Sequence, residues 1–164
     1  GREVALVGTD GGLLAHPHDT TNVRLSPGER AEVVVRMEPG EEAVLPVSED
    51  VRHWHASPKS AVGFLVHAGT MDLNAMGPRR NLSMPGMSVS VGEQIAALER
   101  VAGKNVTARI KRVPDPTIIS IVSGWPRDFA TERALKLGFT TAEKTFDDII
   151  RIHIEDELGG KFAA

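Results

Sequence analysis

The chain has 164 residues, of which 41% are apolar and 25% charged, with a formal net charge of −3. This composition is ordinary for a globular protein that folds in water, and no basic surface is evident that would favour a nucleic-acid partner. The absence of cysteine excludes disulfides, thiolate nucleophiles and cysteine-bound zinc or copper. No apolar run approaches the roughly 20 residues of a membrane span and no signal peptide opens the chain, so we expect a cytoplasmic protein without a membrane partner.

The chain opens with a predicted strand at residues 3–7, which runs into the turn Gly8-Thr9-Asp10-Gly11-Gly12. A strand followed by spaced glycines is also the pattern of a dinucleotide-binding loop. The pattern is incomplete here, because Leu14 replaces the third glycine and Pro17 lies where the helix should run. We therefore predict an ordinary turn, with the residues around Pro17 in a loop.

Three further strands are predicted at residues 22–25, 30–37 and 42–47. The segments between them, Ser26-Pro27-Gly28-Glu29 and Glu38-Pro39-Gly40-Glu41, place Pro and then Gly as a type II turn requires. The strands should form an antiparallel meander that needs apolar cover on one face.

The middle of the chain predicts a strand at residues 51–56 that passes directly into a helix. Ser57 is typical of an N-cap and Pro58 of the first helical position. The apolar run that follows, as far as His67, is typical of a buried helix. We expect the strand to pair with the meander.

Four later segments carry helix start and stop signals, including Ser90 with Glu93 as a capping box. The expected caps are Ser90, Asp115, Thr131 and Thr145, and the expected stops are Gly103, Gly124, Gly138 and Gly159. The second half should therefore be mostly helical.

Residues 7–14, with their Asp-Gly-Gly turn, and residues 25–35 resemble the middle cupredoxin domain of bacterial multicopper oxidases. The resemblance covers about residues 1–45 and carries over no copper ligand, because that family holds its copper in other domains. His53-Trp54-His55 is similar to a copper-binding His-Trp-His-Gly run of the same family, but Ala56 replaces the glycine. A metal site needs three or four converging ligands, so none is predicted here or at His16 and His18.

From about residue 43 to residue 164 the chain resembles the extended short-chain dehydrogenase/reductases of the NAD-dependent epimerase/dehydratase type, in particular the D-erythronate dehydrogenases. The matching motifs are residues 45–58, 77–86, 90–93, Trp125-Pro126, Leu137-Gly138-Phe139 and 145–151. The resemblance implies a C-terminal substrate lobe, with the strand and helix that join it to the nucleotide-binding sheet. We therefore expect an α+β chimera: a cupredoxin-like meander at 1–45 packed on a lobe at 46–164, merged into one globular unit.

The resemblance implies chemistry that this chain does not support. The family binds NAD through a glycine-rich loop and transfers a hydride with a Tyr and a Lys, whereas this chain contains no Tyr and no such loop. We predict a non-catalytic chimera or fragment without bound NAD or copper, which binds a small sugar acid at most weakly. The alternative is an NAD-dependent D-erythronate dehydrogenase or epimerase-like enzyme whose nucleotide-binding half comes from another chain.

The resemblance also implies residues for that weak binding, since arginine suits a carboxylate. The candidates are Arg52, His53, His55, Arg79, Arg80, Trp125 and Arg127. The alternative is that the arginines are surface charges and that Trp125 belongs to the core. Open strand edges at the junction favour a homodimer or strand exchange.

Overall fold

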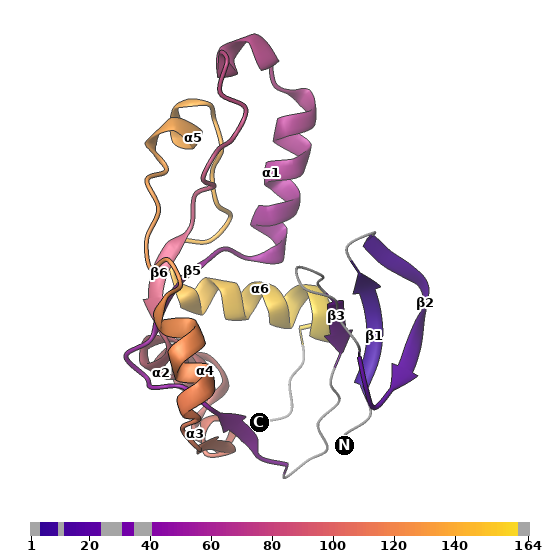
Figure 1. The fold of residues 1–164 in the computed structure, drawn as a ribbon, viewed down its shortest axis with the longest axis vertical. Coiled ribbons are helices and arrows are strands. Elements are labelled where there is room, and N and C mark those ends of the chain that lie inside the picture. Colours follow the sequence, from indigo (N-terminus) through magenta and orange to yellow (C-terminus); the bar gives the residue numbers. More distant parts are fainter. Residues whose placement is uncertain (1–3, 10–11, 24–30, 35–40, 161–164) are drawn as a thin grey trace. The chain divides into compact units, whose positions relative to one another are not determined.

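The computed structural model describes residues 4–9, 12–23, 31–34 and 41–160 (Figure 1). The chain divides into two compact units, Gly1–Glu41 and Glu42–Ala164, and each is described by itself. The predicted α+β class is confirmed: short strands form small sheets and helices dominate the second unit. The division lies after Glu41, so residues 42–45, expected in the first segment, belong to the second unit. The predicted merger of the two segments into one body stays a prediction.

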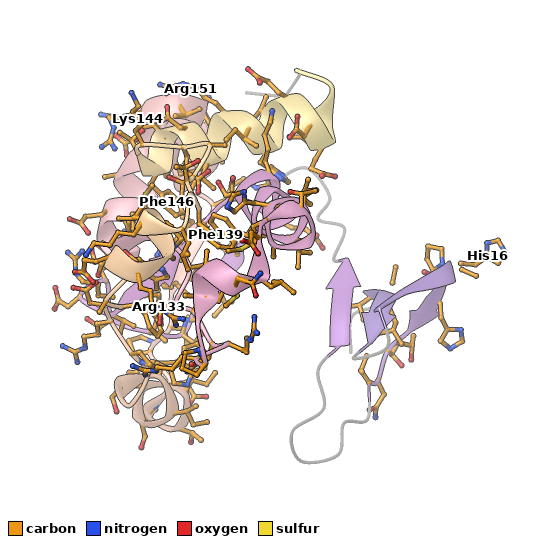
Figure 2. The ribbon with its side chains drawn as sticks, turned by 90° about the horizontal axis from the view of Figure 1, so that it is seen from above. His16, Arg133, Phe139, Lys144, Phe146 and Arg151 are labelled. Carbon is orange, nitrogen blue, oxygen red and sulfur yellow. The ribbon has the colours of Figure 1, made fainter. Side chains whose placement is uncertain are left out.

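The first unit contains an antiparallel sheet of β1 (Val4–Thr9), β2 (Gly12–Thr20) and β3 (Ala31–Val34) in the order β2-β1-β3. The predicted loop around Pro17 is wrong, because Pro17 lies in β2. Among the described strands β2 lies at the edge of the sheet, and its register with β1 is irregular beside Pro17. A proline, which lacks the backbone N–H, is tolerated at such a position. His16 is exposed on β2 (Figure 2).

The predicted meander is only partly right. Of the expected strand at 22–25, residues 22 and 23 are not in a strand, and residues 24 and 25 lie outside the described residues. The two Pro-Gly turns also lie almost wholly outside the described residues. The next strand, β4 (Ala43–Leu45), leaves the meander and pairs in parallel with β7 (Ile110–Arg112) of the second unit. A Pro-Gly turn reverses the chain, but it does not decide which strand the chain pairs with next.

In the second unit, β5 (Arg52–His55) pairs antiparallel with β6 (Met87–Ser90), not with the meander as predicted. Side chains as well as the backbone ladder favour this pairing. Arg52 Nη1 donates to the Ser88 carbonyl oxygen at 2.6 Å, and Trp54 Nε1 donates to the Met84 carbonyl oxygen at 3.2 Å.

The helices of the second unit begin largely where local capping signals predict. They are α1 (Pro58–Thr70), the 3-10 helix η1 (Leu73–Met76), α2 (Val91–Ala102), α3 (Lys104–Thr107), α4 (Pro116–Ser123), α5 (Glu132–Lys136) and α6 (Phe146–Leu158). Ser57 caps α1, and capping boxes begin α2 and α6. Thr131 stands at the N-cap of α5 without a side-chain hydrogen bond.

The core of the second unit lies between α1, α5 and the loop after α5. Phe64, Ala134 and Phe139 are buried together, and Figure 2 shows Phe139 inside the unit while Lys144 and Arg151 lie at its edge. In Figure 1, α1 and α5 lie at one end of this unit, α2, α3 and α4 at the other, and α6 between them. The expectation that α1 is buried is wrong for one of its faces, because Leu65 is 74% exposed.

Candidate functional site

A pocket of about 420 Å³ lies beside β5 and is lined almost entirely by rings. Its lining consists of His53, Trp54, His55, Trp125, Pro126 and Phe129, and we call it the aromatic pocket. Three of these residues come from β5 and three from the segment between α4 and α5. The strand fixes one wall of the pocket, and the opposite wall belongs to a loop.

The rings of the aromatic pocket meet edge to face. The His53 and Trp125 centroids lie 5.5 Å apart, and those of Trp54 and Phe129 lie 5.8 Å apart. Trp125 is 53% exposed, so one face of its indole is accessible. A half-exposed indole beside an imidazole can pack against the C–H face of a carbon chain while the imidazole forms hydrogen bonds.

Gly86 supports the Trp54 side of this pocket. A Cβ atom at Gly86 would lie 2.6 Å from both the His55 carbonyl oxygen and Trp54 Nε1. Both distances are shorter than a van der Waals contact, so the backbone approaches the indole closely only because this residue is glycine. The loop before β6 therefore holds Trp54 in place.

His55 joins the pocket to the helices behind it. Its Nε2 lies 3.0 Å from Gln94 Nε2 of α2, and its ring meets Phe146 of α6 at 5.3 Å. Burial lowers the pKa of His55, and the neighbouring His53 lowers it further. His55 is therefore neutral near neutral pH and offers a hydrogen bond without a fixed positive charge.

The predicted arginines do not converge on the aromatic pocket. Arg52 is engaged elsewhere, because its Nη2 lies 2.8 Å from Glu93 Oε2. Arg80 Nη1 donates to the Leu73 carbonyl oxygen, and the Arg79 carbonyl oxygen accepts from Arg133. Arg127 directly follows the pocket residue Pro126, so of the four arginines it lies nearest to the lining in sequence. Whether any predicted residue binds a substrate stays a prediction.

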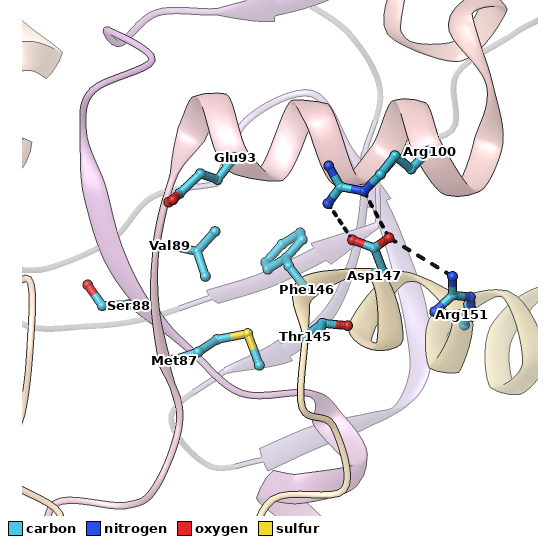
Figure 3. Close-up of a pocket in the computed structure, with 9 residues that line it drawn as sticks. All are labelled: Met87, Ser88, Val89, Glu93, Arg100, Thr145, Phe146, Asp147 and Arg151. Atoms are coloured by element: carbon cyan, nitrogen blue, oxygen red, sulfur yellow. Dashed lines mark hydrogen bonds and ion pairs between the residues drawn. The ribbon is translucent and has the colours of Figure 1, made fainter.

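The structure reveals a second pocket, of about 530 Å³, between β6, α2 and the start of α6 (Figure 3). Its charges are already paired: Arg100 donates to both carboxylate oxygens of Asp147, at 2.6 and 3.1 Å, and Arg151 lies 4.0 Å from the same group. Hydrogen bonds from Arg100 lower the pKa of Asp147. An anion would have to displace Asp147, so this cluster is better suited to joining α2 to α6 than to binding a ligand.

A buried carboxylate lies at the start of α1, and the sequence analysis missed it. Glu143 is 2% exposed, and it accepts hydrogen bonds from the Ser57 N–H at 2.7 Å, the Ser57 hydroxyl at 2.6 Å and the Ser60 hydroxyl at 2.6 Å. Burial by itself would raise the pKa of Glu143, but these hydrogen bonds outweigh it and hold the pKa below its usual value. The network anchors the first turn of α1, because both carboxylate oxygens of Glu143 accept hydrogen bonds from Ser57 or Ser60.

The described residues contain no group of three or more His, Cys, Asp or Glu side chains that could hold a metal ion. Within the same part of the chain, the search for a helix long and apolar enough to cross a membrane finds none.

No family model matches the chain. It is 38% identical over 117 residues to the D-erythronate dehydrogenase of Cupriavidus necator and 34% identical over 119 residues to that of Haemophilus influenzae. These matches include 71% and 73% of this chain, but only 36% and 38% of the relatives.

Two solved structures are similar over the same share of the chain. The nucleoside-diphosphate-sugar epimerase from Agrobacterium tumefaciens is 57% identical with a TM-score of 0.71, covering 74% of this chain and 35% of that one. L-threonine 3-dehydrogenase from Trypanosoma brucei is 19% identical with a TM-score of 0.59, covering 71% and 36%, and this likeness shows the fold alone.

The chain is therefore homologous to D-erythronate dehydrogenases and nucleoside-diphosphate-sugar epimerases over somewhat more than 70% of its length, as the resemblance predicted. It spans little more than a third of the length of those proteins. None of these proteins is a multicopper oxidase, so the cupredoxin resemblance and the chimeric origin gain no support from them.

Proposed function

We propose that residues 42–164 form the substrate side of an NAD-dependent oxidoreductase that acts on a sugar acid or a related sugar derivative, and that this chain alone has no complete active site. The observation that carries the proposal is the extent of the homology, which spans only 35–38% of each similar protein. The complete absence of tyrosine agrees with it, because the resemblance implies a Tyr as the proton donor and acceptor in hydride transfer.

The aromatic pocket supports a polyol chain as the ligand. The accessible face of Trp125 suits C–H groups, and His53 and His55 suit hydroxyls. A carboxylate would have to rely on Arg127, because the Arg52 guanidinium is paired with Glu93. An open pocket whose lining carries no residue with a fixed charge binds a small acid feebly, with a Kd on the order of 1 mM or weaker.

Titration with D-erythronate tests this binding. The indole N–H resonances of Trp54 and Trp125 report the two sides of the pocket separately, and the Trp125 resonance should move further, because its ring is the accessible one. Acetate is the matched control ligand, since it carries the carboxylate without the polyol chain. No movement of either resonance up to saturating D-erythronate would contradict binding in this pocket.

Absence of catalysis is tested with the chain alone, NAD and D-erythronate. We expect no NADH absorbance above that of the buffer. Steady NADH formation by the purified chain, at a rate proportional to its concentration, would contradict the proposal. A polar-to-apolar substitution at the pocket, such as His53→Leu, would then show whether the activity belongs to this protein or to a contaminant.

A second candidate function is an enzyme assembled from two chains, in which another protein supplies the nucleotide-binding half. The exposed apolar side chains of α1, such as Leu65, favour it. Activity would then appear only on mixing with such a half, and activity of the present chain by itself would rule this candidate out.

A further inference from the structure

Another pocket, of about 320 Å³, lies within the second unit between the β4–β7 pair and the helices α2 and α6. Its described lining contains neither a histidine nor a residue with a fixed charge, which separates it from the aromatic pocket and from the pocket of Figure 3. Nine of the ten described residues that line it are apolar, and we call it the apolar pocket. They include Leu45, Ile95, Leu98, Ile110, Phe146 and Ile150.

The size and the lining of the apolar pocket limit what it can hold. Pockets for small ligands span roughly 300–1,000 Å³, so this one is at the lower end and suits a short chain or a single ring. A charged ligand would lose its water without gaining a counter-ion from the described lining. Val44 lines the pocket and is 61% exposed, so a ligand can enter from the solvent beside β4.

Gln94 is the one polar residue in this lining. Its amide nitrogen Nε2 lies 3.0 Å from His55 Nε2, and because an amide nitrogen can only donate, the neutral His55 ring accepts. The amide oxygen Oε1 remains as an acceptor, and none of the described residues donates a hydrogen bond to it. An apolar pocket with one unpaired acceptor is suited to an apolar molecule that carries one donor.

We infer that the apolar pocket is a binding site for a small uncharged molecule with an apolar body and one hydroxyl, such as a short aliphatic alcohol. Its carbon chain lies among the isoleucine and leucine side chains, and its hydroxyl donates to Gln94 Oε1. This site is separate from the aromatic pocket and does not depend on the proposed function. The two pockets share a wall, because Gln94 bonds to His55 and the Phe146 ring meets that of His55 at 5.3 Å.

The probe is n-hexanol, titrated into the full chain labelled with carbon-13 at the isoleucine δ1 methyl groups. The methyl resonances of Ile95, Ile110 and Ile150 should shift and saturate with a Kd on the order of 1 mM, the affinity expected for burying a six-carbon chain. Ile118 and Ile121 of α4 are controls in the same spectrum, because both are exposed and lie outside the pocket. Shifts of all five methyl groups without saturation, or no shift of the pocket methyl groups, would overturn the inference.

Gln94→Met tests the hydroxyl contact, because it keeps the size of the side chain and removes the amide. It should weaken the binding of n-hexanol about fivefold, the loss expected for one hydrogen bond. Hexyl methyl ether is the matched control ligand: it has the same chain but no O–H donor, so its affinity should be the same in both proteins. Equal weakening of the two ligands, or unchanged binding of n-hexanol, would contradict the contact with Gln94 and overturn the inference.

Val44→Trp tests the location, because it places a large ring at the opening of the pocket. It should abolish the shifts of the pocket methyl groups, whereas Val62→Trp, at a position on α1 that is 60% exposed, should leave the affinity unchanged. Circular dichroism checks that both variants are folded. Binding of n-hexanol by folded Val44→Trp with undiminished affinity would overturn the inference. If Val44→Trp does not fold, the comparison of the two ligands with Gln94→Met decides the outcome.

Discussion

The two faces of α1 both carry apolar residues, but one face is buried and the other is exposed to solvent. The inner face places Phe64 against Phe139, and the ring of His67 meets that of Phe139 at a centroid distance of 4.6 Å. The outer face carries Val62 and Leu65 in solvent. The difference shows that apolar sequence identifies surfaces suited to burial, whereas only the presence of a neighbour decides which of them is buried.

Removing the main neighbour on the inner face should have the largest effect. Phe139 is 1% exposed, so Phe139→Ala leaves a cavity beside α1 and should lower the free energy of unfolding by about 3–5 kcal/mol. Urea denaturation followed by circular dichroism measures this. Phe129→Ala is the control. Phe129 is partly exposed, so this substitution should lower the free energy of unfolding much less. Equal losses would mean that Phe139 is not the centre of this core.

The anchor at the start of α1 comes next. Glu143→Gln keeps the shape but removes the charge that accepts three hydrogen bonds from Ser57 and Ser60, and it should lower the free energy of unfolding by about 2–3 kcal/mol. Glu155→Gln on the exposed surface of α6 should change stability by less than about 0.5 kcal/mol. If Glu143→Gln left the free energy of unfolding unchanged, the carboxylate would not be needed to hold α1.

The same carboxylate predicts a pH dependence. Because hydrogen bonds hold the Glu143 pKa below its ordinary value of 4.5, its stabilisation is fully present above that value and is lost as the pH falls through the lowered pKa. The stability difference between the unsubstituted chain and Glu143→Gln should therefore shrink as the pH is lowered from neutral to well below 4.5. Urea midpoints at a series of pH values measure it, and a constant difference would contradict the assignment.

The smallest effect is expected on the outer face. Leu65→Ser removes an exposed side chain and should change the free energy of unfolding by less than about 0.5 kcal/mol. In contrast, Phe64→Ala, at the adjacent residue on the inner face, should be strongly destabilising. Thermal unfolding of both variants makes the comparison. A loss of about 2 kcal/mol or more in Leu65→Ser would show that the outer face is already buried in the free chain.

The sequence predicts features of the fold that depend on neighbouring residues. Ser57, Asp115 and Thr145 cap their helices because each hydroxyl or carboxylate reaches a backbone N–H two or three residues away. Contacts between residues that are distant in the chain were not predicted from the sequence. Ser57 meets Glu143 86 residues away, and β4 leaves the meander for β7.

The candidate site was predictable to a similar degree. His53 and His55 were expected on one strand and Trp125 was named with them, and the structure brings all three to one pocket. Phe129 was missed, since a lone Phe in a loop carries no local signal. The arginines were chosen from the family resemblance and because arginine suits a carboxylate. The pairing of Arg52 with Glu93 depends on a strand pairing that the sequence analysis did not anticipate.

The parallel pair of β4 and β7 can form only late in the synthesis of this protein. Everything from Pro46 to Arg109 separates the two strands, so β4 leaves the ribosome long before its partner exists. During that interval its backbone N–H and C=O groups are open to any passing strand, and Val44 adds an apolar side chain to the exposed edge. Synthesis of β7 closes this ladder, so nascent chains interrupted before Ile110 lack the strand that pairs with β4.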